Sequence, residues 1–307
     1  SNLVFASGSQ FQVTGSVNIS GSLSQGTGSI VSGLSSHAEG YFTRATTNFA
    51  HAEGAYTTAS GEYSHAEGQN TTAQAGGSHA EGYYSTATGN QAHAEGYYTN
   101  GSGSYAHAEG YQTIAIGSYS HAEGRQTQTN NTFAHSEGFG ANAAGDSSHA
   151  EGYLTVTLGS AAHAEGSNTL AQGSGAHAEG EFTVSSGTSA HSEGQYTSAS
   201  GDYSHAEGSG SRALNTVAHA EGVFTLSAGT GSHSEGAYTT ASGNYSHAEG
   251  FSAVASGLYA HAEGRSAVAS GNYSHAEGFS AVASGIYSHA EGLSTIASGQ
   301  YSHTEGI

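Results

Sequence analysis

Small and large side chains recur along this chain with a period of 14 residues. All twenty histidines, from His37 to His303, lie 14 residues apart with no insertion or deletion between them. Each histidine opens a His-small-Glu-Gly phrase, and the second half of a unit reads Thr-x-Ala-x-Gly-x-aromatic-small, as in residues 57–64. Copies that never gain or lose a residue can stack in register. The period therefore predicts a solenoid, in which His is position one of each coil.

Within one coil, small side chains alternate with larger ones, as on a strand that buries one face. The positions before and after His are small, for example Ser64 and Ala66, and positions seven and nine are nearly all Thr, Ser, Ala or Gly, for example Thr113 and Ala115. We expect these four positions to point into the roll. The His and Glu of the same strand would then point outward together.

Glycines divide the coil into two halves, each with room for one strand of about five residues. Position four is Gly in every coil, and position eleven is Gly in most, with Asn131 and Asn215 among the substitutes. Gly and Asn tolerate a positive φ, so both positions predict tight turns. The turn candidates at position four include Gly40, Gly68, Gly124, Gly208 and Gly250.

The composition predicts a thin core and a non-globular shape. There are 48 Gly, no Pro, Met or Trp, and few large aliphatic residues. Burying four small side chains per coil returns little free energy against the entropy of ordering the backbone. A single roll of about 95 Å, at about 4.8 Å per coil, is therefore expected to need partners.

Charge and composition exclude several classes of protein. Only four Arg and no Lys stand against 24 acids, so no basic patch is available for nucleic acid. No apolar run approaches the roughly 18 residues of a membrane-spanning helix, so this segment is not expected to enter a membrane. The absence of Cys excludes disulfides and thiolate metal sites.

The outward His and Glu form two columns of like residues along one face. Neighbouring carboxylates in such a column repel one another, yet Glu occupies position three in all twenty coils. A surface this uniform predicts burial against an equally repetitive partner, most simply a copy of the same chain around a parallel axis. We expect His and Glu to pair between chains, either as imidazolium-carboxylate pairs or as neutral imidazoles that donate to carboxylates, and such pairing would raise the His pKa. The interface candidates include His37, Glu39, His65, Glu67, His121, Glu123, His205, Glu207, His247, Glu249, His289 and Glu291.

The phrase Ser-His-Ala-Glu-Gly-x-x-Thr-x-Ala-x-Gly resembles the head repeat of trimeric autotransporter adhesins, usually Ser-Val-Ala-Ile-Gly-x-x-Ser-x-Ala-x-Gly. The resemblance covers Ser36 to Gly306. It implies an all-β fold, a left-handed parallel β-roll, and a homotrimer of three rolls. Ala38 then points into the roll, while His37 and Glu39 replace the apolar pair expected at the trimer interface. The His-Ala-Glu-Gly variant looks more like repeats of bacteriophage tail fibres.

Two domains are expected. Residues 1–36 contain an alternating apolar-polar stretch with Gly-Ser pairs, from Phe11 to Leu23, that resembles the short β-prism segments of phage fibres. Residues 37–307 hold the twenty His-x-Glu-Gly coils of the β-roll.

The recurring Ser, His, Glu and Tyr suggest three kinds of candidate site. A Ser-His-Glu catalytic triad is excluded, because Ser64 is expected to point inward and His65 outward, so the chain is not expected to be an enzyme. Rings of His at a trimer axis are candidates for occasional metal or ion binding, against a plain His-Glu ladder without metal. Tyr83, Tyr84, Tyr97 and Tyr98 are a candidate sugar-stacking surface, against an aromatic ladder that only packs over the turns.

The sequence thus favours an extracellular, homotrimeric fibre shaft of a phage tail fibre on the virion. It would present a receptor-binding tip or contact a host-surface glycan or protein. The alternatives are a bacterial surface adhesin or extracellular filament of the trimeric autotransporter type, and a structural filament loaded with metal or other ions.

Overall fold

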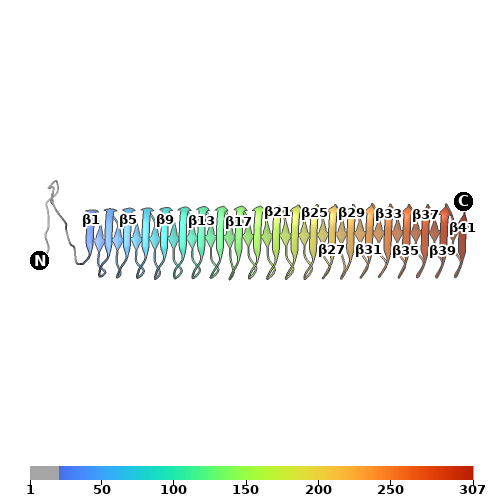
Figure 1. Ribbon diagram of the computed structural model, residues 1–307, viewed down its shortest axis with the longest axis horizontal. Coiled ribbons are helices and arrows are strands. Elements are labelled where there is room, and N and C mark those ends of the chain that lie inside the picture. The colour runs from blue at the N-terminus through green and yellow to red at the C-terminus, as the bar shows by residue number, and fades with distance from the viewer. Residues whose placement is uncertain (1–20, 307) are drawn as a thin grey trace.

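The computed structural model describes residues 21–306, which form a parallel β-solenoid. Its coils stack as a straight rod from the N-terminal β1 to β41 (Figure 1). Each coil contributes one longer and one shorter strand, and each strand pairs in parallel with its equivalent in the next coil. The predicted all-β roll of 14-residue coils is confirmed.

The odd-numbered strands are the longer ones and lie side by side in one sheet. They are β1 (Leu23–Thr27), β3 (His37–Tyr41), β5 (His51–Ala55), β7 (His65–Gln69), β9 (His79–Tyr83), β11 (His93–Tyr97), β13 (His107–Tyr111), β15 (His121–Arg125), β17 (His135–Phe139), β19 (His149–Tyr153), β21 (His163–Ser167), β23 (His177–Glu181), β25 (His191–Gln195), β27 (His205–Ser209), β29 (His219–Val223), β31 (His233–Ala237), β33 (His247–Phe251), β35 (His261–Arg265), β37 (His275–Phe279), β39 (His289–Leu293) and β41 (His303–Gly306).

The even-numbered strands line the other side of the roll and have only two residues each, shorter than the expected five or so. They are β2 (Ile30–Val31), β4 (Arg44–Ala45), β6 (Thr58–Ala59), β8 (Thr72–Ala73), β10 (Thr86–Ala87), β12 (Asn100–Gly101), β14 (Ile114–Ala115), β16 (Gln128–Thr129), β18 (Asn142–Ala143), β20 (Val156–Thr157), β22 (Leu170–Ala171), β24 (Val184–Ser185), β26 (Ser198–Ala199), β28 (Arg212–Ala213), β30 (Leu226–Ser227), β32 (Thr240–Ala241), β34 (Val254–Ala255), β36 (Val268–Ala269), β38 (Val282–Ala283) and β40 (Ile296–Ala297).

The roll begins one coil earlier than the expected boundary at residue 37. β1 pairs with β3 so that Leu23 faces His37 and Gln25 faces Glu39, and β2 pairs with β4. This first coil has the backbone of the repeat without its His and Glu. The β-prism predicted within residues 1–36 otherwise falls on residues 1–20, outside the described residues. Between residues 21 and 306 there is no helix of the length and apolar character that a membrane span requires.

The core is as thin as the composition predicts. The four inward positions of nearly every coil are filled by Ala, Ser and Thr, with Gly101 and Val31 as exceptions, and the largest fully buried side chains among the described residues are threonines. In the coil of residues 51–64, for example, Ala52, Thr57, Ala59 and Ser64 are all buried. The predicted inward and outward faces are therefore confirmed.

The two glycine positions serve different purposes. At position four φ lies between 99° and 124°, from Gly208 to Gly40, so the predicted positive φ is confirmed there. These glycines are the fourth residues of the longer strands rather than part of a loop. At position eleven, as in Gly61 and Gly117, φ is not positive. A Cβ at Gly117 would instead collide with the backbone of the next coil at Asn131, so close coil stacking rather than backbone handedness favours Gly there.

The left-handed turn residues stand at positions six and thirteen, where the sequence carries mostly non-Gly residues. Tyr56 has a φ of 58° and Tyr63 a φ of 60°. In this conformation their N–H groups donate to the preceding coil, at Tyr41 O (2.8 Å) and Asn48 O (3.2 Å). Backbone hydrogen bonds gained between coils thus offset the strain of a left-handed, bulky residue.

Replacing the two glycines of one coil with Ala should separate these roles. Gly110→Ala combines a φ of 114° with a collision against Gly124 O, and we expect a loss of about 2–4 kcal/mol in the free energy of unfolding. Gly117→Ala meets an equally close collision, against Asn131 O, but its φ is not positive, and Ala75 shows that a coil can adjust to a side chain at this position, so it should cost clearly less. Urea unfolding of both variants is the measurement, and equal midpoints would contradict this division.

Two buried hydroxyls in the coil of residues 51–64 offer a second comparison. Thr57 Oγ1 is buried with no hydrogen-bond partner among the described residues, whereas Ser64 Oγ donates to Gly61 O at 2.6 Å. We expect Thr57→Val to leave the thermal midpoint unchanged or higher, because no hydrogen bond is lost. Ser64→Ala should cost about 0.5–1.5 kcal/mol. The reverse order of thermal midpoints would show that Thr57 makes a bond in solution.

Candidate functional site: the His-Glu face

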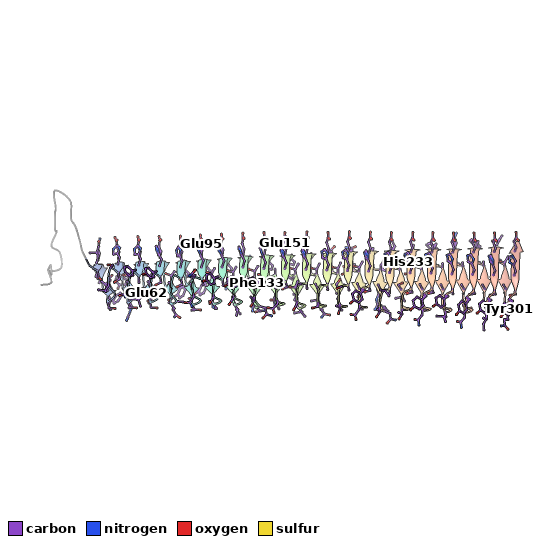
Figure 2. All side chains as sticks on the ribbon, turned by 60° about the horizontal axis from the view of Figure 1, so that its bottom comes forward. Glu62, Glu95, Phe133, Glu151, His233 and Tyr301 are labelled. Carbon is purple, nitrogen blue, oxygen red and sulfur yellow. The ribbon has the colours of Figure 1, made fainter. Side chains whose placement is uncertain are left out.

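The longer strands place every His and Glu of the repeat on one face. His is the first residue and Glu the third of each strand from β3 to β41, so both side chains leave the same side of the sheet. Figure 2 shows Glu95 and Glu151 along one side of the rod, with Glu62 and Tyr301 on the opposite side. We call this surface the His-Glu face.

The imidazoles form one continuous stack along the His-Glu face. Ring centroids of consecutive His residues lie 4.6–4.9 Å apart from His37 to His303. Most neighbouring rings are nearly parallel, as for His219 and His233 with an interplanar angle of 1°. The coil spacing alone sets this distance, because each His faces the His of the next strand.

Glu lies beside His in the same coil. In eighteen of the twenty coils the distance from His Nε2 to Glu Oε2 is between 3.4 Å, as for His93 and Glu95, and 4.0 Å, as for His135 and Glu137. The stack buries His Nε2, which in most coils has no hydrogen-bond partner among the described residues. The carboxylates are about half exposed, for example 47% for Glu123.

The stack lowers the pKa of several imidazoles. Burial is the main cause, and repulsion between neighbouring imidazoles adds to it, while the adjacent Glu acts in the opposite direction. The histidines whose pKa is lowered are His65, His93, His121, His135, His177, His191, His205, His233 and His261. In these nine coils of the single roll, desolvation within a column of like rings outweighs the attraction of Glu. The rise in the His pKa expected on pairing between chains stays a prediction.

Five groups on the His-Glu face bring three potential metal ligands within 4.8 Å of one another. They combine imidazole nitrogens and carboxylate oxygens, a donor set that suits Zn²⁺ and similar ions. Since coils are so closely spaced, dications in every layer would repel strongly. The groups are His177-Glu179-His191, His219-Glu221-His233, His233-Glu235-His247, His261-Glu263-His275 and Glu277-His289-Glu291.

The tyrosines proposed as a ligand surface form two stacked columns next to the turns. Tyr83 stacks on Tyr97 with centroids 5.1 Å apart, and Tyr84 stacks on Tyr98 at 4.8 Å. Their faces are therefore partly covered by one another, as the ladder interpretation expects. Binding of a sugar to these four tyrosines stays a prediction.

Two of the four cations extend the same aromatic columns, which the sequence analysis missed. The Arg125 guanidinium lies over the rings of Tyr111 and Phe139, at 5.4 and 5.3 Å from their centroids. Arg265 lies in the same way between Phe251 and Phe279. The signal was an Arg at position five with an aromatic residue 14 positions before and after it, a spacing that permits cation–π contacts.

Because the pKa of these histidines is lowered, the stability of the roll should depend on pH. A His whose folded pKa lies below its unfolded value of about 6.5 resists protonation in the folded state. The stability that comes from keeping this His neutral is therefore complete above about pH 6.5. It is lost as the pH falls through the pKa of the folded state. We expect a lower thermal midpoint at pH 5.5 than at pH 7.5, a range chosen above ordinary carboxyl titration. A midpoint that rises on acidification would instead support imidazolium-carboxylate pairing between chains.

Comparison with known proteins identifies the family of this repeat. The family described as the YadA head domain repeat matches residues 52–73, 80–99, 102–126, 158–190, 248–274 and 276–302, which together make up half of the chain. A search of curated proteins finds no match. The matched stretches lie within the stacked coils, where the same small inward residues and glycines recur. The repeat is a structural, non-enzymatic adhesin head module, and the chain belongs to the YadA head domain repeat family.

Proposed function

We propose that this chain is the elongated head of a homotrimeric bacterial surface adhesin, with three parallel rolls whose His-Glu faces meet at a shared axis. The single observation that carries the proposal is the His-Glu face itself. It keeps one His and one Glu in each of twenty coils, whereas the neighbouring surface positions vary freely. Membership in an adhesin head family favours the cell surface as the location.

The exposure of the two columns supports a missing partner. Stacking between coils covers part of each side chain: His303 and Glu305, in the last coil, are 57% and 72% exposed, against 34% and 46% for His289 and Glu291. In the interior coils, the parts of His and Glu that stay exposed face away from the roll. Only another molecule can cover them there. A threefold arrangement would cover all twenty layers with one repeated contact.

Neutral imidazoles fit such an interface better than charged ones. Where its pKa is lowered, as for His121, the imidazole is mostly neutral at pH 7 and carries one N–H donor, which a carboxylate of the adjacent chain can accept. Each such layer would then contain three donors and three acceptors without burying a positive charge. Of the two expected forms of the His-Glu pair, the lowered pKa thus favours the neutral imidazole.

The thin core is a second reason to expect partners. No fully buried side chain among the described residues is larger than Thr, so one roll gains little from apolar burial. Contact between three rolls would add buried area in every coil. The same geometry explains how a long rod of small residues could be stiff enough to hold a binding surface away from a cell.

A phage tail-fibre shaft is the second candidate, because His and Glu replace the apolar pair of the usual adhesin repeat in every coil. Antibody labelling of intact cells and of purified virions separates the two. A metal-loaded filament is the third candidate, carried by the five His and Glu groups, and elemental analysis of the purified protein tests it.

The mass of the native particle tests the trimer. We expect light scattering to give three times the chain mass of 30.6 kDa, with a rod-like frictional ratio from sedimentation. The double variant Glu165→Lys and Glu179→Lys should weaken the trimer, because it places cations among the His stack. Glu181→Lys, on the same strand but outside the column, is the matched control. A monomeric native particle would overturn the proposed function.

A further inference from the structure

The ring column at position thirteen is interrupted near the N-terminal end of the rod. Phe49 stacks on Tyr63 with centroids 4.8 Å apart, and a second ladder begins where Tyr105 stacks on Tyr119 at 4.9 Å. Between the two ladders the column holds Gly77 and Gln91. One ring position is therefore empty and the next holds only an amide side chain.

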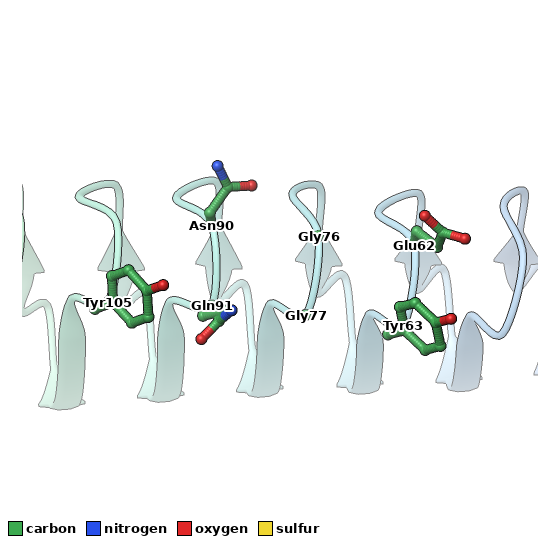
Figure 3. Close-up of a pocket in the computed structure, with 7 residues that line it drawn as sticks. All are labelled: Glu62, Tyr63, Gly76, Gly77, Asn90, Gln91 and Tyr105. Carbon is green, nitrogen blue, oxygen red and sulfur yellow. The ribbon is translucent and has the colours of Figure 1, made fainter.

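The empty position keeps the backbone of a ring-bearing turn. Gly77 has a φ of 65°, close to the 60° of Tyr63 one coil earlier. Gly76 precedes it in the only Gly-Gly pair of the chain, so this coil lacks both side chains that elsewhere line the turn. The result is a recess of about 640 Å³ lined by Glu62, Tyr63, Gly76, Gly77, Asn90, Gln91 and Tyr105 (Figure 3).

The recess leaves one face of Tyr63 open. Tyr63 is 63% exposed, whereas rings inside a ladder, such as Tyr119 and Tyr259, are 54% and 50% exposed. Its other face is covered by Phe49 at a nearly parallel 2°. A flat ring could therefore continue the stack over Gly77 at the usual spacing of 4.5–7 Å between stacked centroids.

Polar groups surround this open ring face. Glu62 contributes a carboxylate, and Asn90 and Gln91 contribute amides. Across residues 21–306, none of these three side chains makes a hydrogen bond within the protein. At position twelve, which Glu62 and Asn90 also occupy, Asn48 and Asp202 behave differently, since each accepts a hydrogen bond from a backbone N–H of the preceding coil. The polar groups of the recess are thus available to a ligand.

We propose that this recess binds a neutral pyranose ring of a glycan. The C–H face of a pyranose, which is slightly positive, suits the negative face of Tyr63, and sugar hydroxyls can donate to Glu62 and bond with Asn90 and Gln91. Glu62 and the chain's net charge of −20 oppose an anionic sugar. A purely apolar ring would leave the carboxylate and both amides without partners.

A second, smaller recess extends the surface. It has a volume of about 310 Å³, shares Glu62, and is otherwise lined by Ser32, Gly33, Thr46, Thr47 and Asn48. Two adjoining recesses fit two consecutive sugar units better than one. The ligand class is therefore a neutral oligosaccharide, and this inference rests on the proposed adhesive function.

Gly77→Tyr is the most direct test, because it restores the missing ring. The same residue type stands at this position and φ in several coils, so the roll should accept it, with the flexible Gln91 as its nearest neighbour. Gly175→Tyr is the matched control: it has the same φ of 65°, the same column position and no ring in the coils before and after it. Tyr63→Ala removes the stacking face by an independent route.

The full chain is applied to an array of neutral galactose-, glucose-, mannose- and N-acetylglucosamine-containing oligosaccharides and their sialylated counterparts. We expect binding to at least one neutral glycan, reduced about tenfold or more by Gly77→Tyr and by Tyr63→Ala and unchanged by Gly175→Tyr. Binding to no neutral glycan, or undiminished binding by Gly77→Tyr, would overturn the inference. The mass of the same sample separates this failure from that of the proposed function, because a trimer without glycan binding leaves the trimeric head intact.

Discussion

Parallel hydrogen bonding in strict register is the constraint on which every other feature of this molecule depends. Each residue of a coil lies opposite the equivalent residue 14 positions later, as His37 faces His51 and Glu39 faces Glu53. The bonds continue through the turns, where Tyr56 N donates to Tyr41 O. A side chain therefore always lies next to the side chains at the same position of the neighbouring coils. Where the residue type recurs, as for His and Glu, the same contact recurs along the rod.

The repetition of each contact along the rod explains which residue types occur at each position of the coil. Small inward residues and Gly at position four relieve collisions that would otherwise recur in each coil, and rings at the turns gain a stacking contact from each neighbour. Imidazoles gain the same contact, but a protonated imidazole would meet another positive charge above and below it. Burial within the column lowers the pKa of His121 and others, and this repulsion lowers it further, which favours a neutral ladder over a charged one.

The sequence was sufficient to predict the repeat, the roll and the inward and outward faces, because a constant period and alternation of size translate directly into stacking. It was not sufficient for the turns. The left-handed conformation of Tyr56 and Tyr63 follows from bonds to a neighbouring coil, which no local preference of Tyr indicates. Likewise, the direction of the His pKa depends on how much of each ring its neighbours cover, and a pattern of charges carries no information on burial.

Any regular feature of the repeat is present in every coil. A binding site that occurs once along the rod can therefore arise only where one coil departs from the repeat. Gly76 and Gly77 are such a break: they keep the backbone and remove two side chains. The neighbouring coils, held in register, then present Tyr63 and Asn90 at fixed spacing on either side. The hydrogen bonds between coils thus also hold the backbone fixed where a side chain is missing. The loss of one ring therefore leaves a recess of defined shape rather than a loose loop.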